Sequence, residues 1–219
     1  MLRALFEKTD DAVYISHLDL MRLFQRAFKR AGLALTHTQG FNPRPSVSIA
    51  LPLSLGVESH CELLDFDLEG EIPEPEELCR RLNKKLVAGV RVLQVYTPQR
   101  KIKHLALLEC SLTLEYDGGV PQQAQACLQE LFSRETLLVE KKSKNGNKQQ
   151  DILTMIRRLT IEQESPQELT IRVLLHCQNP ALNPMQLIAA IEQELPQLAP
   201  DFVRCCRMEV YDEEETVFR

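Results

Sequence analysis

The sequence lacks any long apolar run. No segment approaches the roughly 20 consecutive apolar residues needed to span a bilayer. The N-terminal residues become charged at Arg3 and Glu7, too early for the apolar core of a signal peptide. A composition of 44% hydrophobic and 26% charged residues excludes disordered and collagen-like chains. We therefore expect a soluble, cytoplasmic protein with no membrane partner.

The familiar catalytic motifs are missing as well. The sequence has no Gly-rich phosphate loop, no H-E-x-x-H, no G-x-S-x-G and no C-x-x-C. It also lacks the C-x-x-x-C-x-x-C motif that holds the iron–sulfur cluster of radical S-adenosylmethionine (radical SAM) enzymes. These absences predict that the chain is not an enzyme of those classes and binds no such cluster by itself.

The seven cysteines form an odd set without regular spacing, which is typical of reduced thiols. Three adjacent pairs, His60-Cys61, His176-Cys177 and Cys205-Cys206, could in principle contribute to a metal site. Neighbouring residues of a strand point to opposite faces, so each pair would supply one ligand at most. We expect these cysteines to pack in the core, with no metal and no cofactor.

Charge is distributed unevenly, although the net charge is only −5. Residues 16–50 are basic and contain a single acid, Asp19, whereas residues 62–77 contain acids and no base. A second basic stretch runs over residues 141–158, and the tail 212–215 is acidic. An anionic partner should therefore meet a restricted patch instead of the whole surface.

Hydrophobic periodicity predicts the order β-α-β-β-α-β twice. The first set comprises strands at 2–6 (with 12–15), 46–53, 62–68 and 90–96 and helices at 17–31 and 73–86. The second comprises strands at 107–116, 169–177 and 202–211, strand candidates at 137–142 and 159–164, and helices at 121–132 and 185–195. We predict an α+β protein of two tandem ferredoxin-like (split βαβ) units with antiparallel sheets, at 1–97 and 105–219. The second unit contains the basic insertion 141–158, a loop or short helix.

The helix that follows Ser16 carries the most specific polar pattern. Ser16 is a good N-cap, and Asp19 at the third helical position completes a variant capping box. Arg22, Arg26 and Lys29 recur at spacings of four and three and form a basic stripe opposite the apolar one. The following segment Gly40-Phe41-Asn42-Pro43-Arg44-Pro45 is a rigid loop, because each proline fixes its own φ and restricts the residue before it.

This helix and loop predict an anion- or RNA-binding edge, since free N–H groups and the helix dipole also favour anions at the helix start. A solvated helix face, with Ser16 and Asp19 acting only as caps, is the alternative. The candidate binding residues are Ser16, His17, Asp19, Arg22, Arg26, Lys29, Arg30, Phe41, Asn42 and Arg44.

Three of the candidates have open alternatives. His17 is a weak candidate for an acid–base catalyst, because no nucleophile or second base stands at a suitable spacing; a structural hydrogen-bonding role is the alternative. Phe41 could stack on a base, but packing in the core is favoured. The segment from Lys141 to Lys148 could be a second nucleic-acid contact or a solvated hairpin loop, and the loop is favoured.

The motifs Tyr-Ile-Ser-His-Leu-Asp-Leu-Met-Arg at 14–22 and Gly-Phe-Asn-Pro-Arg-Pro at 40–45 resemble those of the radical-SAM-associated (radical-SAM-linked) family, a bacterial domain of unknown function. Ile-Ala-Leu-Pro-Leu at 49–53, Gly56 and Glu62 continue the match. At position 44 the family often has histidine, where this chain has arginine. The resemblance implies a standalone protein or an extension of a radical SAM enzyme, encoded near RNA-processing and ribosomal genes.

Taken together, these features predict a non-catalytic accessory module that presents a substrate, RNA, to a separate radical SAM enzyme; no DNA partner is expected. One alternative is a metal-independent RNA-processing enzyme, by analogy with CRISPR-repeat endonucleases built from tandem ferredoxin-like units. The other is a protein-interaction subunit whose basic patch meets an acidic surface on its enzyme.

Overall fold

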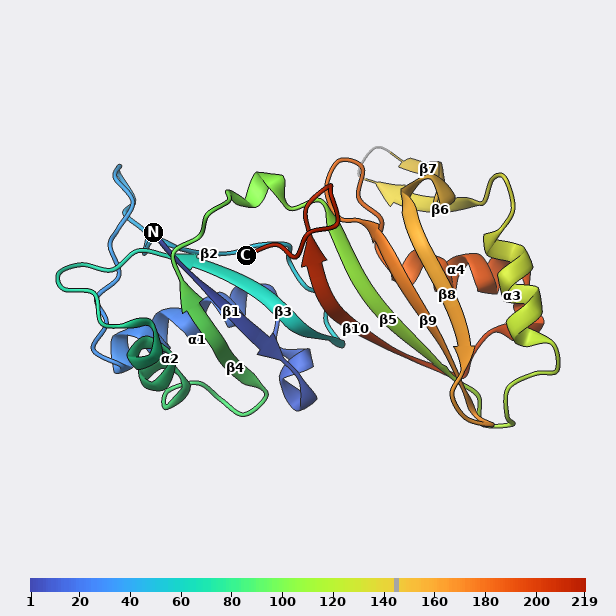
Figure 1. The fold of residues 1–219 in the computed structure, drawn as a ribbon, viewed down its shortest axis with the longest axis horizontal. Coiled ribbons are helices and arrows are strands. Elements are labelled where there is room, and N and C mark those ends of the chain that lie inside the picture. The colour runs from blue at the N-terminus through green and yellow to red at the C-terminus, as the bar shows by residue number, and fades with distance from the viewer. Residues whose placement is uncertain (144–145) are drawn as a thin grey trace. The chain divides into compact units, whose positions relative to one another are not determined.

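The computed structural model describes the backbone of residues 1–143 and 146–219 and the side chains of residues 1–140 and 149–219. The protein is a mixed α+β protein with antiparallel strand pairing and four α-helices among these residues (Figure 1). The chain divides into two compact units. Unit 1 comprises residues 1–104 with Arg219, and unit 2 comprises residues 105–218. In the described part of the chain, no helix is both long and apolar enough to cross a membrane.

Unit 1 forms an antiparallel sheet in the order β4-β1-β3, with β2 paired to β3. Its elements are β1 (Leu2–Lys8), a 3-10 helix (Asp10–Tyr14), α1 (His17–Arg30), β2 (Val47–Ile49), β3 (Val57–Phe66), α2 (Pro75–Asn83), β4 (Val90–Tyr96) and a 3-10 helix (Ile102–His104). The register places Ala4 of β1 between Leu64 of β3 and Val95 of β4. Alternate residues of these strands therefore share one face of the sheet.

The core of unit 1 lies between that face and the two helices. Side chains of α1, α2 and the strands form one hydrophobic cluster, to which α2 contributes Leu78 and Leu82. Two aromatic contacts hold α1 to the sheet: Phe24 meets Phe6 edge-on, and Phe28 meets Phe66, each with ring centroids 4.8 Å apart. The apolar stripe of α1 therefore faces the sheet, and its charged residues face outward.

Two strand predictions in unit 1 are wrong. Residues 12–14 belong to a 3-10 helix instead of a strand, and Ile15 is its C-cap, because Asp10 has a φ of 51° and redirects the chain. The predicted strand 46–53 shortens to Val47–Ile49. The left-handed backbone at Leu51 (φ 47°), followed by Pro52, which has no N–H to donate, ends the pairing early.

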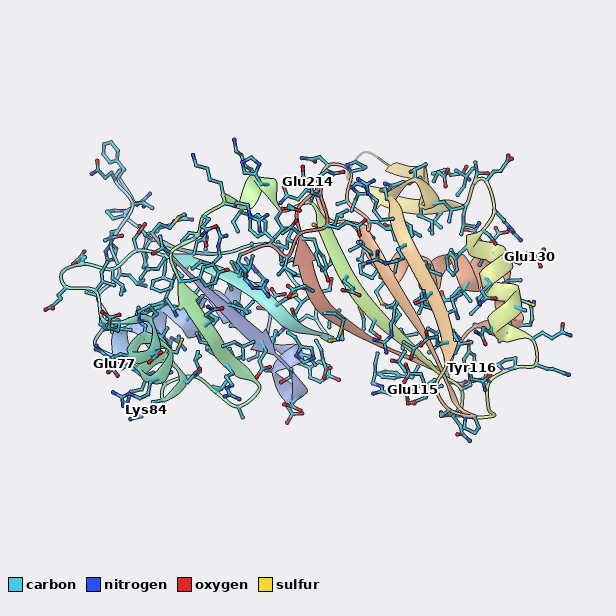
Figure 2. The ribbon with its side chains drawn as sticks, viewed as in Figure 1. Glu77, Lys84, Glu115, Tyr116, Glu130 and Glu214 are labelled. Atoms are coloured by element: carbon cyan, nitrogen blue, oxygen red, sulfur yellow. The ribbon has the colours of Figure 1, made fainter. Side chains whose placement is uncertain are left out.

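Unit 2 forms an antiparallel sheet in the order β10-β5-β9-β8. Its elements are β5 (Leu107–Glu115), α3 (Ala124–Phe132), β6 (Leu138–Ser143), β7 (Gly146–Asp151), a 3-10 helix (Leu153–Met155), β8 (Ile156–Gln163), β9 (Glu168–His176), α4 (Met185–Glu194), a 3-10 helix (Pro196–Leu198) and β10 (Phe202–Tyr211). Tyr116, directly after β5 (Figure 2), donates a buried hydrogen bond to the carbonyl of Leu198 at 3.0 Å.

The described residues of the insertion 141–158, for which the sequence predicts a loop or short helix, include parts of β6, β7 and β8 and the 3-10 helix Leu153–Met155. β6 and β7 pair as a hairpin, from Leu138 opposite Asp151 onward, and a 3-10 turn leads into β8. The side chains of residues 141–148 lie outside the described part, so the predicted nucleic-acid contact from Lys141 to Lys148 stays a prediction.

Candidate functional site

The start of α1 is capped as its sequence predicts. The hydroxyl oxygen of Ser16 accepts a hydrogen bond from the backbone N–H of Asp19 at 3.2 Å, and the hydroxyl donates to a carboxylate oxygen of Asp19 at 2.7 Å. Arg22 donates to the other carboxylate oxygen at 3.0 Å. The bond from Ser16, followed by that from Arg22, lowers the pKa of Asp19 below its ordinary value. Ser16, Asp19 and Arg22 therefore stabilise the helix end, as well as lying at its surface.

The other end of α1 is closed by a residue from α2. Gly32 adopts a φ of 66°, which favours glycine and stops the helix. The guanidinium of Arg81 donates to the carbonyls of Ala31 and Gly32. A cation at a helix C-terminus also interacts favourably with the helix dipole. Both ends of α1 are therefore fixed, which holds its outward face in place.

The outward face of α1 carries the basic ridge, which we define as Arg22, Arg26 and Lys29. Arg22 is engaged with Asp19, as described above. Among the residues that the structure describes, Arg26 and Lys29 make no hydrogen bond or ion pair, and both are exposed. Arg30 is also exposed but donates to the backbone carbonyl of Lys85 at 2.6 Å. Of the four predicted cations on α1, Arg22 and Arg30 thus bind other groups of the protein, and Arg26 and Lys29 remain available to a ligand.

The loop after α1 folds back on itself. The backbone N–H of Thr38 donates to the carbonyl of Arg44 at 2.8 Å, and the N–H of Arg44 donates to the Thr38 hydroxyl at 3.0 Å. This pairing carries the loop tip away from the hydrophobic cluster, and Asn42 and Arg44 are exposed. Phe41 is fully exposed, with a relative accessibility of 105%. The prediction that Phe41 packs in the core is therefore wrong.

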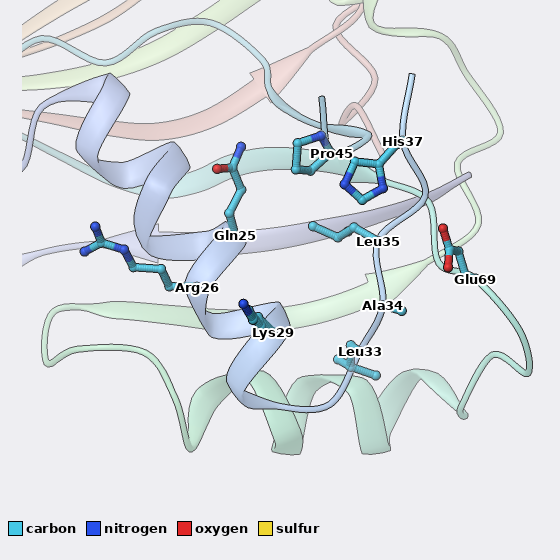
Figure 3. Close-up of a pocket in the computed structure, with 9 residues that line it drawn as sticks. All are labelled: Gln25, Arg26, Lys29, Leu33, Ala34, Leu35, His37, Pro45 and Glu69. Carbon is cyan, nitrogen blue, oxygen red and sulfur yellow. The ribbon is translucent and has the colours of Figure 1, made fainter. Parts of the chain in front are cut away.

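A pocket lies beside the basic ridge, and we call it the Leu35 pocket (Figure 3). Its volume is about 470 Å³, and it is lined by Gln25, Arg26, Lys29, Leu33, Ala34, Leu35, His37, Pro45 and Glu69. Arg26 and Lys29 enter from α1, whereas Glu69 lies on the opposite side and Leu33 and Leu35 lie between them (Figure 3). The pocket thus has an apolar floor with cations at one end and a carboxylate at the other.

A second hollow of about 490 Å³ adjoins the other side of the ridge. It is lined by Ile15, Asp19, Arg22, Leu23, Arg26, Arg30 and Val87. Arg26 lines both spaces, so the ridge separates two concave surfaces. The charges of this second hollow are arranged differently from those of the Leu35 pocket, because Asp19 forms an ion pair with Arg22 in the second hollow.

The structure brings only part of the predicted site together. Arg26 and Lys29 meet in the Leu35 pocket, and Asp19, Arg22, Arg26 and Arg30 meet in the second hollow. Neither space includes Ser16, His17, Phe41, Asn42 or Arg44 among its lining residues.

Several residues of the Leu35 pocket were not predicted as site residues. Leu33, Leu35 and His37 alternate along the chain after Gly32, so a period of two could have placed them on one side of an extended segment. Glu69 has no such local signal. It reaches the pocket through an isolated bridge between Leu35 and Leu68 and a backbone hydrogen bond from its own N–H to Ala34, at 2.8 Å.

His17 is the first residue of α1 and is partly exposed. In the part of the chain that the structure covers, it forms no hydrogen bond or ion pair with another residue, and no nucleophile or second base is held against it. The described residues also contain no cluster of three or more His, Cys, Asp or Glu side chains arranged to hold a metal ion. In the described part of the chain, none of the seven cysteines forms a disulfide.

One solved structure with a similar fold is a chain from a Cbf5–Nop10–Gar1 complex, with a TM-score of 0.51 and 8% sequence identity. The match covers 96% of this chain but 50% of the other, so this chain spans about half the length of the protein it resembles. At such low identity the likeness concerns the fold alone.

A second structure, of a candidate glycine cleavage system transcriptional repressor, is 12% identical over 94% of this chain and 96% of the other, with a TM-score of only 0.24. No curated protein matches the sequence. A family profile matches residues 1–184, most of the chain. The chain therefore belongs to the bacterial family described as "uncharacterized protein conserved in bacteria (DUF2344)".

Proposed function

We propose that this chain is a non-catalytic, cytoplasmic accessory module that binds RNA and presents it to a separate radical SAM enzyme. The observation that carries the RNA-binding part is the pair Arg26 and Lys29, which are exposed, lie three residues apart on a capped helix and make no hydrogen bond or ion pair with another described residue. Elsewhere on the same helix, cations are held by Asp19 or by a backbone carbonyl.

Phosphate is the anion that this arrangement suits. Arginine and lysine donate charge-assisted hydrogen bonds to phosphate oxygens, and such contacts position a nucleic acid without identifying its sequence. The two side chains lie three residues apart on one helix face, so they can meet neighbouring parts of one backbone. Since the net charge of the chain is −5, the attraction is confined to this face.

The exposed Phe41 supports single-stranded over double-stranded RNA. Aromatic side chains of RNA-binding proteins stack on unpaired bases. The bases of a duplex are already stacked on one another, so an aromatic side chain cannot reach their faces. A fully exposed phenyl ring at the tip of a paired loop has no intramolecular contact that accounts for its presence. We therefore assign Phe41 to stacking, in place of the core position expected from the sequence.

We also propose that each unit is a ferredoxin-like split βαβ unit. The supporting observations are the strand orders β4-β1-β3-β2 and β10-β5-β9-β8, antiparallel throughout, with two helices in each unit. The proposal that the partner is a radical SAM enzyme rests only on the motifs at 14–22 and 40–45, because these motifs resemble those of the radical-SAM-associated family.

The test is a measurement of RNA affinity as a function of salt concentration. For single-stranded RNA, the slope of log K against log [salt] changes by about 0.7 per phosphate contact, so Arg26→Glu with Lys29→Glu should reduce the slope by about 1.4. The matched control is Lys101→Glu with Lys103→Glu, which makes the same charge change at exposed lysines in unit 1 but outside α1.

Weaker binding with a smaller slope in the α1 double variant, and not in the control, would support the proposal. Equal slopes in both folded variants would overturn it, because the attraction would then be a general charge effect. If RNA does not bind the wild-type chain at all but a radical SAM enzyme does so in a salt-sensitive way, the chain is a protein-interaction subunit instead.

A further inference from the structure

We infer that the Leu35 pocket holds one unstacked guanine nucleotide of a single-stranded RNA. The inference rests on the proposed RNA-binding function and adds to it the position and identity of a base. It is based on the opposite charges at the two ends of the pocket, which require a ligand with an anionic group at one end and hydrogen-bond donors at the other.

The size and floor of the pocket suit a flat, partly apolar group. A volume of about 470 Å³ lies within the ~300–1,000 Å³ typical of small-molecule sites. Leu33 and Leu35 are themselves nearly buried, at 5% and 8% relative accessibility, so they form a firm floor instead of a mobile surface. A nucleobase can lie on such a floor by its face while its polar edges remain free to bond.

The end of the pocket at α1 suits a phosphate. Arg26 and Lys29 both line this end, and the guanidinium of Arg26 extends away from Leu35 and Glu69 (Figure 3). Neither makes a hydrogen bond or ion pair with another described residue, although Asp19 attracts Arg26 electrostatically, so a phosphate would not have to displace an existing ion pair. A guanidinium and an ammonium can together satisfy two or more phosphate oxygens.

The opposite end requires a hydrogen-bond donor. An ionised carboxylate only accepts hydrogen bonds, and the carboxylate of Glu69 makes none with the other residues that the structure describes. Its backbone is fixed by the bond to Ala34, so the side chain starts from a defined point at the pocket rim. A phosphate at this end would be repelled, which orients the nucleotide with its base toward Glu69.

Guanine is the base whose Watson–Crick edge matches two carboxylate oxygens. It presents two adjacent donors, the ring N1–H and the exocyclic N2–H₂, whereas adenine and cytosine place an acceptor beside their amino group and uracil flanks its single N–H with carbonyls. A carboxylate facing those three edges meets at least one repelling acceptor. Glu69 therefore selects guanine.

The experiment compares three fluorescein-labelled nonamers of uridine that carry guanosine, inosine or adenosine at the central position. Inosine lacks only the exocyclic amino group of guanosine, so the pair isolates one hydrogen bond to a charged acceptor. We expect the full-length chain to bind the guanosine nonamer about tenfold more tightly than the inosine nonamer. The adenosine nonamer should bind no more tightly than the inosine one.

The variant Glu69→Gln separates recognition from charge. Removing a carboxylate reduces repulsion of RNA and should slightly raise the affinity for all three nonamers if Glu69 acts only through its charge. If Glu69 recognises guanine, the variant instead loses most of the tenfold preference. The matched control is Glu71→Gln, which removes an exposed carboxylate two residues away that does not line the pocket and should keep the preference.

The outcomes also separate this inference from the function on which it rests. Equal binding of the three nonamers, with a salt slope that still depends on Arg26 and Lys29, would overturn the guanine pocket and leave RNA binding intact. Absence of binding to every nonamer would overturn both. If free guanosine 5′-monophosphate binds as tightly as the guanosine nonamer, the pocket takes a free nucleotide and the RNA part of the inference is wrong.

Discussion

Unit 1 and unit 2 have the same order of strands in their sheets, yet their cations have different surroundings. In unit 2, arginines pair with acids of the same unit; the pairs are Arg134–Glu194, Arg157–Glu213, Arg158–Glu215, Arg172–Glu164 and Arg204 with Glu115 and Glu168. In unit 1, Arg26 and Lys29 have no such partner among the described residues. Among the described side chains, these arginines of unit 2 are therefore paired, whereas unit 1 has two exposed cations without an ion pair beside paired ones such as Arg22.

The helices show the same contrast. The hollow beside α3 in unit 2 has a volume of about 580 Å³ and is lined by glutamines, alanines, a valine and a proline, with no charged side chain. The Leu35 pocket of unit 1 is of similar size but has charged groups at both ends. Units with the same strand order therefore differ in where charged side chains line a hollow, and the residues on and beside the helices determine this difference.

The cores of the two units also differ, and this difference leads to the largest expected effect. The core of unit 1 contains two aromatic contacts, and Leu128 of α3 is fully buried in unit 2. Phe24→Ala should lower the free energy of unfolding by about 3–5 kcal/mol and abolish RNA binding, because α1 loses its attachment to the sheet. Leu128→Ala should cost about 2–5 kcal/mol and leave the affinity for RNA unchanged while the chain is folded.

Urea denaturation followed by circular dichroism, together with RNA titration at 25 °C, measures both quantities. Loss of RNA affinity in a folded Leu128→Ala variant would break the comparison, since unit 2 would then contribute to binding.

A glycine in each unit gives the next largest difference. Gly89 has a φ of 78°, and a Cβ there would lie 2.4 Å from the carbonyl oxygen of Thr9 and 2.8 Å from Cβ of Ala12. Gly89→Ala should therefore destabilise the protein by at least about 2 kcal/mol, through both strain and the clash. Gly118 of unit 2 has open space around its Cβ position, so Gly118→Ala should change stability by less than about 0.5 kcal/mol. Thermal unfolding of the two variants measures this difference in stability. Equal unfolding midpoints would contradict the prediction that a side chain at position 89 is strained and clashes with Thr9 and Ala12.

Reversing charge in unit 2 should have a smaller effect on binding than reversing it in unit 1. Arg157 and Arg158 are neighbouring exposed cations, but each is paired with a tail acid, Glu213 and Glu215. Arg157→Glu with Arg158→Glu should leave the salt slope of RNA binding unchanged, whereas the α1 double variant should weaken RNA binding on the order of tenfold or more. A slope reduced equally by both double variants would show that RNA contacts both units, and the contrast between them would fail.

The smallest effect concerns acids whose pKa is lowered in both units. Hydrogen bonds from Ser16 and then Arg22 lower the pKa of Asp19, and hydrogen bonds from Arg134 and then Gln193 lower that of Glu194. A depressed folded-state pKa contributes stability above the unfolded-state pKa of about 4, and this contribution is lost as the pH falls through the folded-state pKa.

Asp19→Asn and Glu194→Gln should therefore each be slightly less stable than wild type at pH 7 and converge with it toward pH 2. Urea midpoints measured from pH 2 to pH 7 test this. A difference that persists unchanged at pH 2 would show that the bonds act independently of charge.

Much of unit 1 could be predicted from local patterns. The helix 17–30 follows from its cap, its apolar stripe and Gly32, and strand 90–96 from its alternation. The turn at 10–14 and the early end of the strand at 49 could not, because they depend on single left-handed residues, Asp10 and Leu51, that have no glycine to mark them. The basic ridge could be predicted from the spacing of its cations. The sequence did not indicate which of these cations already form a hydrogen bond or ion pair within the protein.

Local sequence patterns specify the α+β class, the capped helix and the basic face of α1, because each depends on residues within a few positions of one another. Three other features depend on contacts that form only in the folded chain. Phe41 is exposed because the loop pairs with itself, Arg30 is engaged because Lys85 is brought beside it, and Glu69 faces Arg26 and Lys29 because a bridge joins Leu35 to Leu68. The contacts of Arg30 with Lys85 and of Leu35 with Leu68 join segments about 30 or more residues apart, and local periodicity carries no information about which distant groups a folded chain places together.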